Sequence, residues 1–264
     1  MKRKHTGLLI VSLAVYGFLF VPLFIVAATS VTSASYVSFP PVGFSLKWYG
    51  KVFASRSFMQ SLWLSTRISL YATLIALIAG IPGAYTLSRC EFPGKRLLKN
   101  FFFAPNIIPQ IVMGFSLFQF IILKLRLPVT VSLLVGLTVA ISTYILRGVG
   151  SSIESLDYAI EEAAMSLGLN RVQTFFKVVL PNITSGILSA FLLAFISAFN
   201  NVPVTIFLSG PGVVTLPVTM MNYMEYNYDP AVSALSVMLM IMSLAIMLIS
   251  ERLLHISGAA GMEE

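Results

Sequence analysis

Long apolar stretches separated by short polar segments form the main pattern of this chain. Six stretches come close to the ~20 apolar residues that an α-helix needs to cross the hydrocarbon core of a bilayer. They cover residues 7–29, 61–88, 101–123, 128–146, 183–208 and 230–250. The pattern predicts an all-α, polytopic membrane protein with six transmembrane helices, organised as one transmembrane domain over residues 1–264.

The basic residues predict the direction of the spans. Cytosolic loops of membrane proteins carry an excess of Lys and Arg, and an even number of spans places both termini on one side. Eleven basic residues fall on the side of the termini: Lys2, Arg3, Lys4, Arg89, Lys95, Arg96, Lys99, Arg147, Arg171, Lys177 and Arg252. Five fall on the other side: Lys47, Lys51, Arg56, Lys124 and Arg126. We therefore expect both termini, and the polar segment 150–182, in the cytosol.

Composition supports this class. The chain is 57% hydrophobic and 10% charged, with a mean hydropathy of +0.89, which excludes an ordinary soluble domain. Its net charge of +7 reflects topology, since no basic stripe or base-stacking motif indicates nucleic acid. The first apolar run is longer than the core of a secretory signal peptide, so we expect it to be a retained span.

The segment 150–182 carries the local signals of two short helices. Asp157 is placed to cap a first helix, whose early turns hold Glu161 and Glu162 where negative charge suits the helix dipole. Gly168 is placed to end that helix, and Leu167 offers an apolar anchor beside it.

A second short helix follows in the same segment. Asn170 and Gln173 have the spacing of a capping box, and Pro181 is expected to close the helix before the next apolar run. The small Ala163 and Ala164 would let a partner surface approach the first helix closely. An ordinary amphipathic loop helix with a glycine cap would share these features.

The spacing of these residues resembles a known motif. Glu162-Ala163-Ala164 is followed after three residues by Gly168 and after nine more by Val178-Val179-Leu180-Pro181. This pattern resembles the EAA loop of ABC-transporter permease subunits and departs from it only in having Val178 for Ile. The resemblance implies that the loop docks on a cytosolic ATPase, through Glu162, Ala163, Ala164, Leu167, Gly168 and Pro181.

Two further stretches resemble one branch of that family. Residues 39–49, rich in Pro, Gly and aromatics, and residues 89–96, Arg-Cys-Glu-Phe-Pro-Gly-Lys-Arg, are similar to loops of polyamine-type permeases. From their amphipathic character we expect Trp48 and Tyr49 to lie at headgroup depth.

Polar residues inside the spans are candidates for the translocation pathway. Asn200 and Asn201 are costly in hydrocarbon, so we expect them to face the bundle interior or the pathway. The polyamine-type permeases that this chain resembles often carry acidic residues at this place, and the neutral amides found here argue against a strongly cationic solute. Arg67 either belongs to the pathway or extends to the outer interface. Pro105 and Pro109 in the third span either line a cavity or are plain kinks.

Other chemistry finds no support in the sequence. There is no P-loop motif, no nucleophilic triad and no metal-spaced cluster, so catalytic and metal sites are expected to be absent. The single cysteine, Cys90, is interpreted as a small apolar filler.

The resemblance therefore implies the permease subunit of a binding-protein-dependent ABC importer in a bacterial inner membrane. It implies a second permease forming a heterodimer, two ATPase subunits that bind ATP and Mg²⁺, and an extracytoplasmic solute-binding protein. The solute is expected to be small and organic, polyamine-like or derived from an amino acid. The alternatives are a stand-alone secondary transporter, whose intramembrane carboxylates are missing here, and a membrane anchor for soluble partners.

Overall fold

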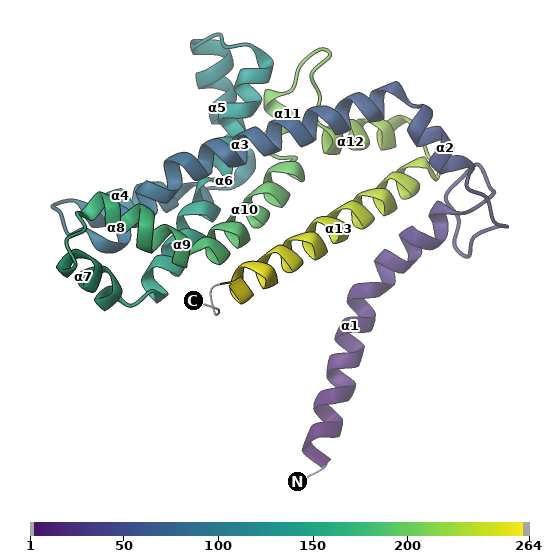
Figure 1. Cartoon of the computed structure of the whole chain (residues 1–264). Helices are drawn as coiled ribbons and strands as arrows, with labels where there is room; N and C mark the ends of the chain where they lie inside the picture. The colour runs from purple at the N-terminus through teal and green to yellow at the C-terminus, as the bar shows by residue number, and fades with distance from the viewer. Residues whose placement is uncertain (1–2, 261–264) are drawn as a thin grey trace. The chain divides into compact units, whose positions relative to one another are not determined.

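A computed structural model of the chain describes residues 3–260. The described residues are helical almost throughout, and the β structure among them is limited to an isolated bridge between Gly210 and Val213. Figure 1 shows the helices in chain order. The all-α membrane class expected from the apolar pattern is confirmed.

Four of the described helices are long and apolar enough to cross a bilayer by length and composition. They are α1 (Arg3–Ser30), α3 (Arg56–Arg89), α6 (Val129–Ser155) and α13 (Ala231–Ala260). They correspond to the first, second, fourth and sixth expected spans. Both chain termini and Lys2, which entered the orientation argument, lie outside the described residues.

The third expected span is interrupted. Helix α4 (Lys95–Phe103) leads into a 3₁₀ turn at Ala104–Asn106, and α5 (Gln110–Leu117) continues as a π-helix to Lys124. Pro105 lies in the turn and Pro109 caps α5. A proline lacks the N–H that a continuous helix would use, so the interruption falls at these two residues.

The fifth expected span is also divided. Helix α10 (Thr184–Phe199) ends before Asn200, and α11 (Thr205–Leu208) begins after a non-helical stretch containing Pro203. The preceding helical segment, Arg171–Asn182, is bent by 70° relative to α10. A single straight helix over 183–208, as the hydropathy pattern predicts, is therefore not formed.

Contacts divide the chain into two compact units. Unit 1 comprises residues 1–60 and 219–245, and unit 2 comprises residues 61–218 and 246–264. The remaining short helices are α2 (Lys47–Ala54), α7 (Tyr158–Ser166), α8 (Arg171–Thr174), α9 (Leu180–Asn182) and α12 (Leu216–Tyr226), with a second π-helix at Phe175–Val179.

The core of unit 2 is built on the packing of α6 against α10. One stripe of α6 is fully buried at helical spacing: Leu133, Leu137, Ile141, Ile145, Val149 and Ile153. The facing stripe of α10 is made of small residues: Ala190, Ala194 and Ala198. Small side chains let two helix backbones approach closely within a membrane. This packing sets the frame that carries the loop after α6.

Unit 1 is held together around α2. The indole of Trp48 is buried and donates its Nε1–H to the carbonyl of Thr32 at 2.9 Å. Trp48 is therefore buried inside the protein and its polar atom has a partner there, while its depth in the bilayer stays a prediction. Lys51 forms an ion pair with Asp229, which also accepts a hydrogen bond from Tyr223 at 2.8 Å.

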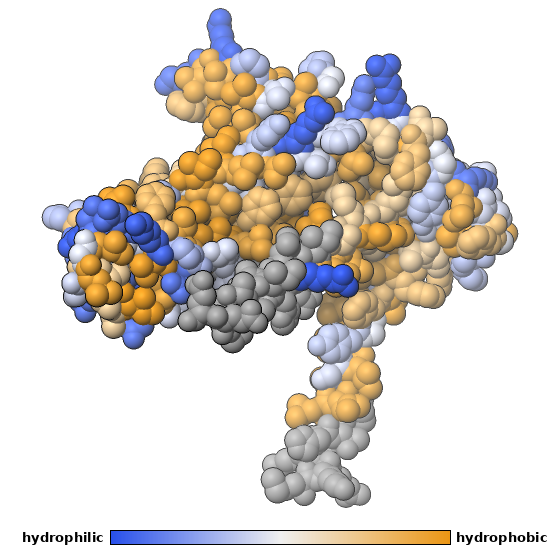
Figure 2. Space-filling model, in the orientation of Figure 1, coloured by the Kyte–Doolittle hydropathy of each residue, from blue (hydrophilic) through white to orange (hydrophobic). Residues whose placement is uncertain are grey.

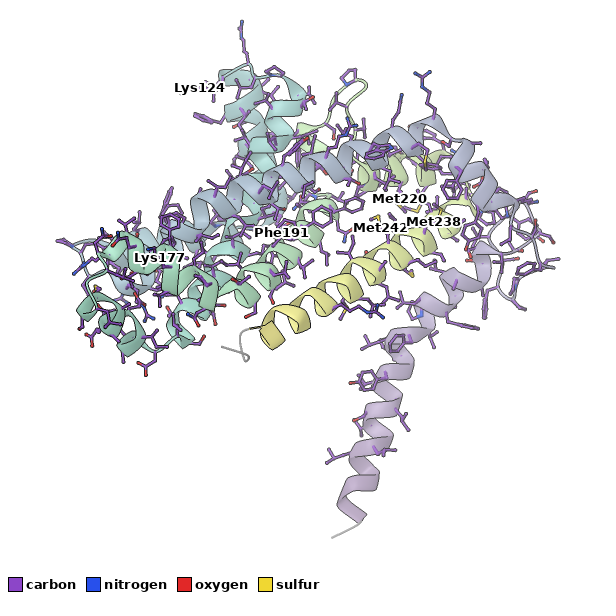
Figure 3. The ribbon with its side chains drawn as sticks, viewed as in Figure 1. Lys124, Lys177, Phe191, Met220, Met238 and Met242 are labelled. Atoms are coloured by element: carbon purple, nitrogen blue, oxygen red, sulfur yellow. The ribbon has the colours of Figure 1, made fainter. Side chains whose placement is uncertain are left out.

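Most of α12 and the first half of α13 also belong to unit 1. Figure 3 shows Met220 of α12 near Met238 and Met242 of α13. Within unit 1, the C-terminal end of α1 contacts the start of α13, where the hydroxyl of Thr29 donates a hydrogen bond to Ser233 Oγ at 3.1 Å. The described side chains of α1 from residue 11 to 24 are exposed and mostly apolar, as expected for a surface that faces lipid or another membrane subunit.

Candidate coupling and translocation site

Helix α7 and its caps form as the local sequence predicts. Asp157 accepts a hydrogen bond from the backbone N–H of Ala159 at 3.0 Å, which satisfies one of the free donors of the first turn. At the other end Gly168 has a φ of +96°. Only glycine adopts this left-handed conformation without strain, so Gly168 fixes where α7 stops.

The second helix begins with a complete capping box. The backbone N–H of Gln173 donates to Asn170 Oδ1 at 2.8 Å, and that of Asn170 donates to Gln173 Oε1 at 3.0 Å. Pro181 does not end the helix: helical structure runs on through Asn182, and the bend falls at Ile183. A π-helix at Phe175–Val179 precedes the proline, whose missing N–H disturbs the regular ladder.

The two neighbouring glutamates of α7 point in opposite directions. Glu162 is exposed, as are Ala163 and Leu167, and Leu167 is 87% exposed. Glu161 is 1% exposed and Ala164 is 8% exposed. Ala164 lies against the protein itself, so of the two alanines only Ala163 is exposed to an approaching partner, and its docking role stays a prediction.

Glu161 joins α7 to the end of α3. Its carboxylate accepts a hydrogen bond from Arg89 Nε at 2.7 Å and another from the hydroxyl of Tyr85 at 2.9 Å. Arg89 also donates to the carbonyl of Leu156 at 2.7 Å, and its guanidinium lies 5.3 Å from the ring centre of Tyr158. One arginine thus holds the end of α6 and the start of α7 against α3.

This ion pair was not foreseen from the sequence, where Arg89 entered only as a cytosolic charge. The spacing of Glu161 and Ala164 nevertheless pointed to a buried face of the helix. Glu161 and Ala164 share one face of a 3.6-residue helix, and a small residue beside an acid on one face indicates a packed position. The basic partner, Arg89, could not be chosen among the other loop cations from sequence alone.

The exposed side of this region combines charge with apolar groups. Leu167, Val172 and Phe176 are all more than half exposed, and Arg171 and Lys177 lie among them in sequence. Figure 2 shows hydrophilic and hydrophobic residues mixed around the α7–α8 end. Figure 3 places Lys177 in this part of unit 2 and Lys124 in the separate region that holds α5. Several exposed apolar side chains within one short polar segment make this face a candidate docking surface.

The structure separates the two candidate asparagines of the pathway. Asn200 is exposed at the end of α10. Asn201 is 5% exposed: its Oδ1 accepts the N–H of Val204 at 3.0 Å, and its Nδ2 donates to Gln110 Oε1 at 3.3 Å. Asn201 therefore stabilises the break before α11, whereas the side chain of Asn200 is exposed.

Gln110 is a polar residue that the sequence reasoning missed, although its position just after Pro109 was a clue. Its helix approaches the break so closely that a Cβ on Gly114 would lie 2.5 Å from the carbonyl oxygen of Pro203. Arg67 stands apart from this group. It is exposed on α3, with its guanidinium 5.2 Å from the ring centre of Trp63.

The helical bundle and its interrupted apolar helices are the features of a membrane transport protein. A known family matches residues 72–258 and is described as the binding-protein-dependent transport system inner membrane component. The chain belongs to this family and is the permease subunit of an ABC importer.

Individual relatives of the chain are also named as permease proteins of transport systems. The chain is 29% identical over 238 residues to the spermidine/putrescine transport system permease protein PotC of Haemophilus influenzae, covering 90% of this chain and 92% of that protein. It is 29% identical over 246 residues to the putrescine transport system permease protein PotI of Escherichia coli, covering 88% and 85%.

Solved structures share the fold. A chain from a bacterial ABC transporter involved in the import of the acidic polysaccharide alginate matches with a TM-score of 0.72 at 19% identity, covering 95% of this chain and 96% of that one. A chain of the MetNI methionine ABC transporter in an inward facing conformation matches with a TM-score of 0.66 at 19% identity, covering 76% and 95%.

Proposed function

We propose that this permease forms half of a translocation pathway for a small organic solute, polyamine-like or derived from an amino acid, and that α7 couples it to a cytosolic ATPase. The single observation that carries the coupling role is the arrangement of α7, capped at both ends, presenting Leu167 to solvent and fixed to α3 through Glu161. A second permease would supply the other half of the pathway, and two ATPase subunits would bind ATP and Mg²⁺.

The contacts of Arg89 describe how movement would pass from the loop to the membrane. ATP-driven closure of the ATPases would displace α7. Because Arg89 holds both Glu161 and the carbonyl of Leu156, α3 and α6 would move with it, and the packing of α6 on α10 would carry the motion to the break at Asn200. Rigid helices moving about such breaks would expose the pathway to each side in turn.

Two observations together limit the class of solute that this permease would carry. The relatives PotC and PotI are named for spermidine and putrescine. In this chain the polar group beside the break is the neutral amide of Asn200, which cannot form an ion pair with an ammonium group. A solute with fewer positive charges than spermidine, recognised first by an extracytoplasmic binding protein, satisfies both observations.

Reconstitution tests the function as a whole. Proteoliposomes containing this chain, its partner permease and the ATPase should take up the ligand of the cognate binding protein only when ATP is supplied on the ATPase side. Uptake that runs on an ion gradient without the ATPase would support a secondary transporter and contradict the proposal.

A further inference from the structure

A cavity of about 170 Å³ lies in unit 2 among the ends of α3, α4 and α6. It is lined by Ala84, Leu87, Ser88, Lys99, Phe103, Leu146, Arg147, Gly150, Ser151 and Glu154. This volume is more than ten times the ~10–15 Å³ that a single ordered water needs. The cavity lies apart from the break at Asn200 and shares no residue with the exposed face of α7.

The charges around the cavity favour an anion. Lys99 and Arg147 both line it, and Glu154 is the single acidic residue in its lining. Glu154 approaches Lys99 at 3.9 Å, the outer limit of an ion pair. Arg147 has no acidic partner among the described residues and lies over the ring of Phe103, 5.2 Å from its centre. A planar guanidinium held in this way is a ready donor to phosphate.

Hydroxyl groups add neutral donors on the same cavity. Ser88 and Ser151 line it, the first half-buried and the second exposed. Gly150 lies next to Ser88, since a Cβ on this glycine would be in ordinary van der Waals contact with Ser88 Oγ at 3.7 Å. Two hydroxyls and a guanidinium around one opening match the several acceptor oxygens of a phosphodiester.

Helix α4 supplies an apolar surface next to this polar cavity. Its sequence, KRLLKNFFF, is amphipathic, and Leu97 and Phe101 are 76% and 72% exposed. Lys99 comes from the same helix. A short helix with Lys and Arg on one face and Leu and Phe on the other lies in the plane of the membrane interface. Free phosphate would leave this apolar face without a partner, whereas a lipid would cover it with acyl chain.

We propose that the cavity binds the headgroup of an anionic phospholipid, with Arg147 contacting the phosphate, Ser88 and Ser151 donating to its oxygens, and the acyl chains covering Leu97 and Phe101. Basic pockets between transmembrane helices are known to hold such headgroups. The inference requires α4 to lie at the interface and does not depend on the coupling role of α7, so lipid retention and ATPase retention report on the two proposals separately.

Native mass spectrometry of the purified full chain, delipidated in detergent and mixed with phosphatidylglycerol or phosphatidylcholine, tests the site. Wild type should retain phosphatidylglycerol in preference to phosphatidylcholine. Arg147→Gln should weaken that retention about fivefold, in line with the contribution of one basic residue at an anionic headgroup. Arg147→Lys, which keeps the charge, should retain most of it.

Arg96→Gln is the matched control, since it removes one positive charge from α4 outside the cavity lining. It should leave retention unchanged, and the unfolding temperatures of all three variants should match wild type. The proposal is overturned if Arg96→Gln loses as much lipid as Arg147→Gln, if the two lipids are retained equally, or if millimolar inorganic phosphate displaces phosphatidylglycerol.

Discussion

Adjacent residues of α7 lie in different surroundings because a helix turns by about 100° per residue. Glu161 faces inward and is paired, while Glu162 faces outward and is available to a partner. A buried ion pair contributes little net stability, since desolvation offsets most of its Coulomb energy. Its value here is positional, because the fork of Arg89 fixes where α7 begins relative to α3.

Removing the buried charge should show this positional role. Glu161→Gln leaves Arg89 without its anion, so we expect a loss of about 3 kcal/mol in stability and a marked fall in ATP-driven uptake. Thermal unfolding in detergent and vesicle uptake measure the two effects. Glu162→Gln is the matched control: it changes an exposed residue and should alter stability by less than about 0.5 kcal/mol. Equal unfolding temperatures for the two variants would show that the Arg89 contact does not hold α7.

The two asparagines at the break should also respond differently. Asn201→Ala removes the acceptor for the N–H of Val204 and the donor to Gln110, so it should lower stability by about 1 kcal/mol. Asn200→Leu removes an exposed amide and should depress uptake while the unfolding temperature stays near that of wild type. If Asn200→Leu transports normally, Asn200 does not line the pathway.

The sequence predicts the helix caps, which depend on neighbouring residues, but it does not predict contacts between residues that are far apart in the chain. The caps at Asp157 and Gly168 follow from the preferences of the residues themselves. The partner of Glu161 lies 72 positions away, and no periodicity selects Arg89 from the other basic residues. The burial of Trp48 was likewise hidden, because the carbonyl of Thr32 that satisfies its indole is visible only once the loop is folded.

Among the elements, hydropathy located the apolar segments but not their breaks. The mean hydropathy of a segment is the same whether the segment forms one helix or two. The expected spans 101–123 and 183–208 therefore each contain an interruption that hydropathy did not predict. The prolines at 105, 109 and 203 marked these places. The starts of the two short helices in the polar segment and the end of the first were predicted, because their caps are specific residue types at fixed spacing, but the end expected at Pro181 was not found there.

Helix α2 and the turn before α13 are connected by a cluster that depends on pH. Burial alone would raise the pKa of Asp229, but hydrogen bonds from Lys51 and Tyr223 outweigh it and hold the pKa below the ordinary value of 3.8. The hydrogen bond to Asp229 raises the pKa of Lys51 above its ordinary 10.5. The ion pair is therefore present across neutral pH.

A carboxylate with a lowered pKa stabilises the folded state above its ordinary pKa, and the contribution is lost as the pH falls through the lowered value. Asp229→Asn should therefore lower the unfolding temperature at neutral pH, and the difference from wild type should shrink as the pH drops below 3.8. Melting curves at several pH values measure this. Exposed Glu225→Gln serves as control, and a difference that persists unchanged in acid would show that the Asp229 charge is not responsible.

For the whole molecule, the arrangement of basic residues predicts the orientation of the chain in the membrane. Single cysteines at Ser35 and Ser166, both exposed, in a Cys90→Ser background should react with an impermeant maleimide from opposite sides of the membrane. Ser166 should react only when the cytosolic side is open to the reagent. Labelling of both positions from the same side in intact cells would contradict the proposed orientation.

Coupling through α7 is tested most directly at Gly168. A β-branched residue at φ +96° is strained by on the order of 1–2 kcal/mol, and relief of that strain would turn Leu167 and Glu162 away from the partner groove. Gly94→Val is the matched control, because Gly94 also has a positive φ, +86°, and like Gly168 has open space around it, but lies outside the loop. We expect Gly168→Val to be purified without its ATPase, or with ATP hydrolysis no longer tied to uptake, while Gly94→Val retains both. A full complement of ATPase and wild-type uptake in Gly168→Val would contradict the coupling role of α7.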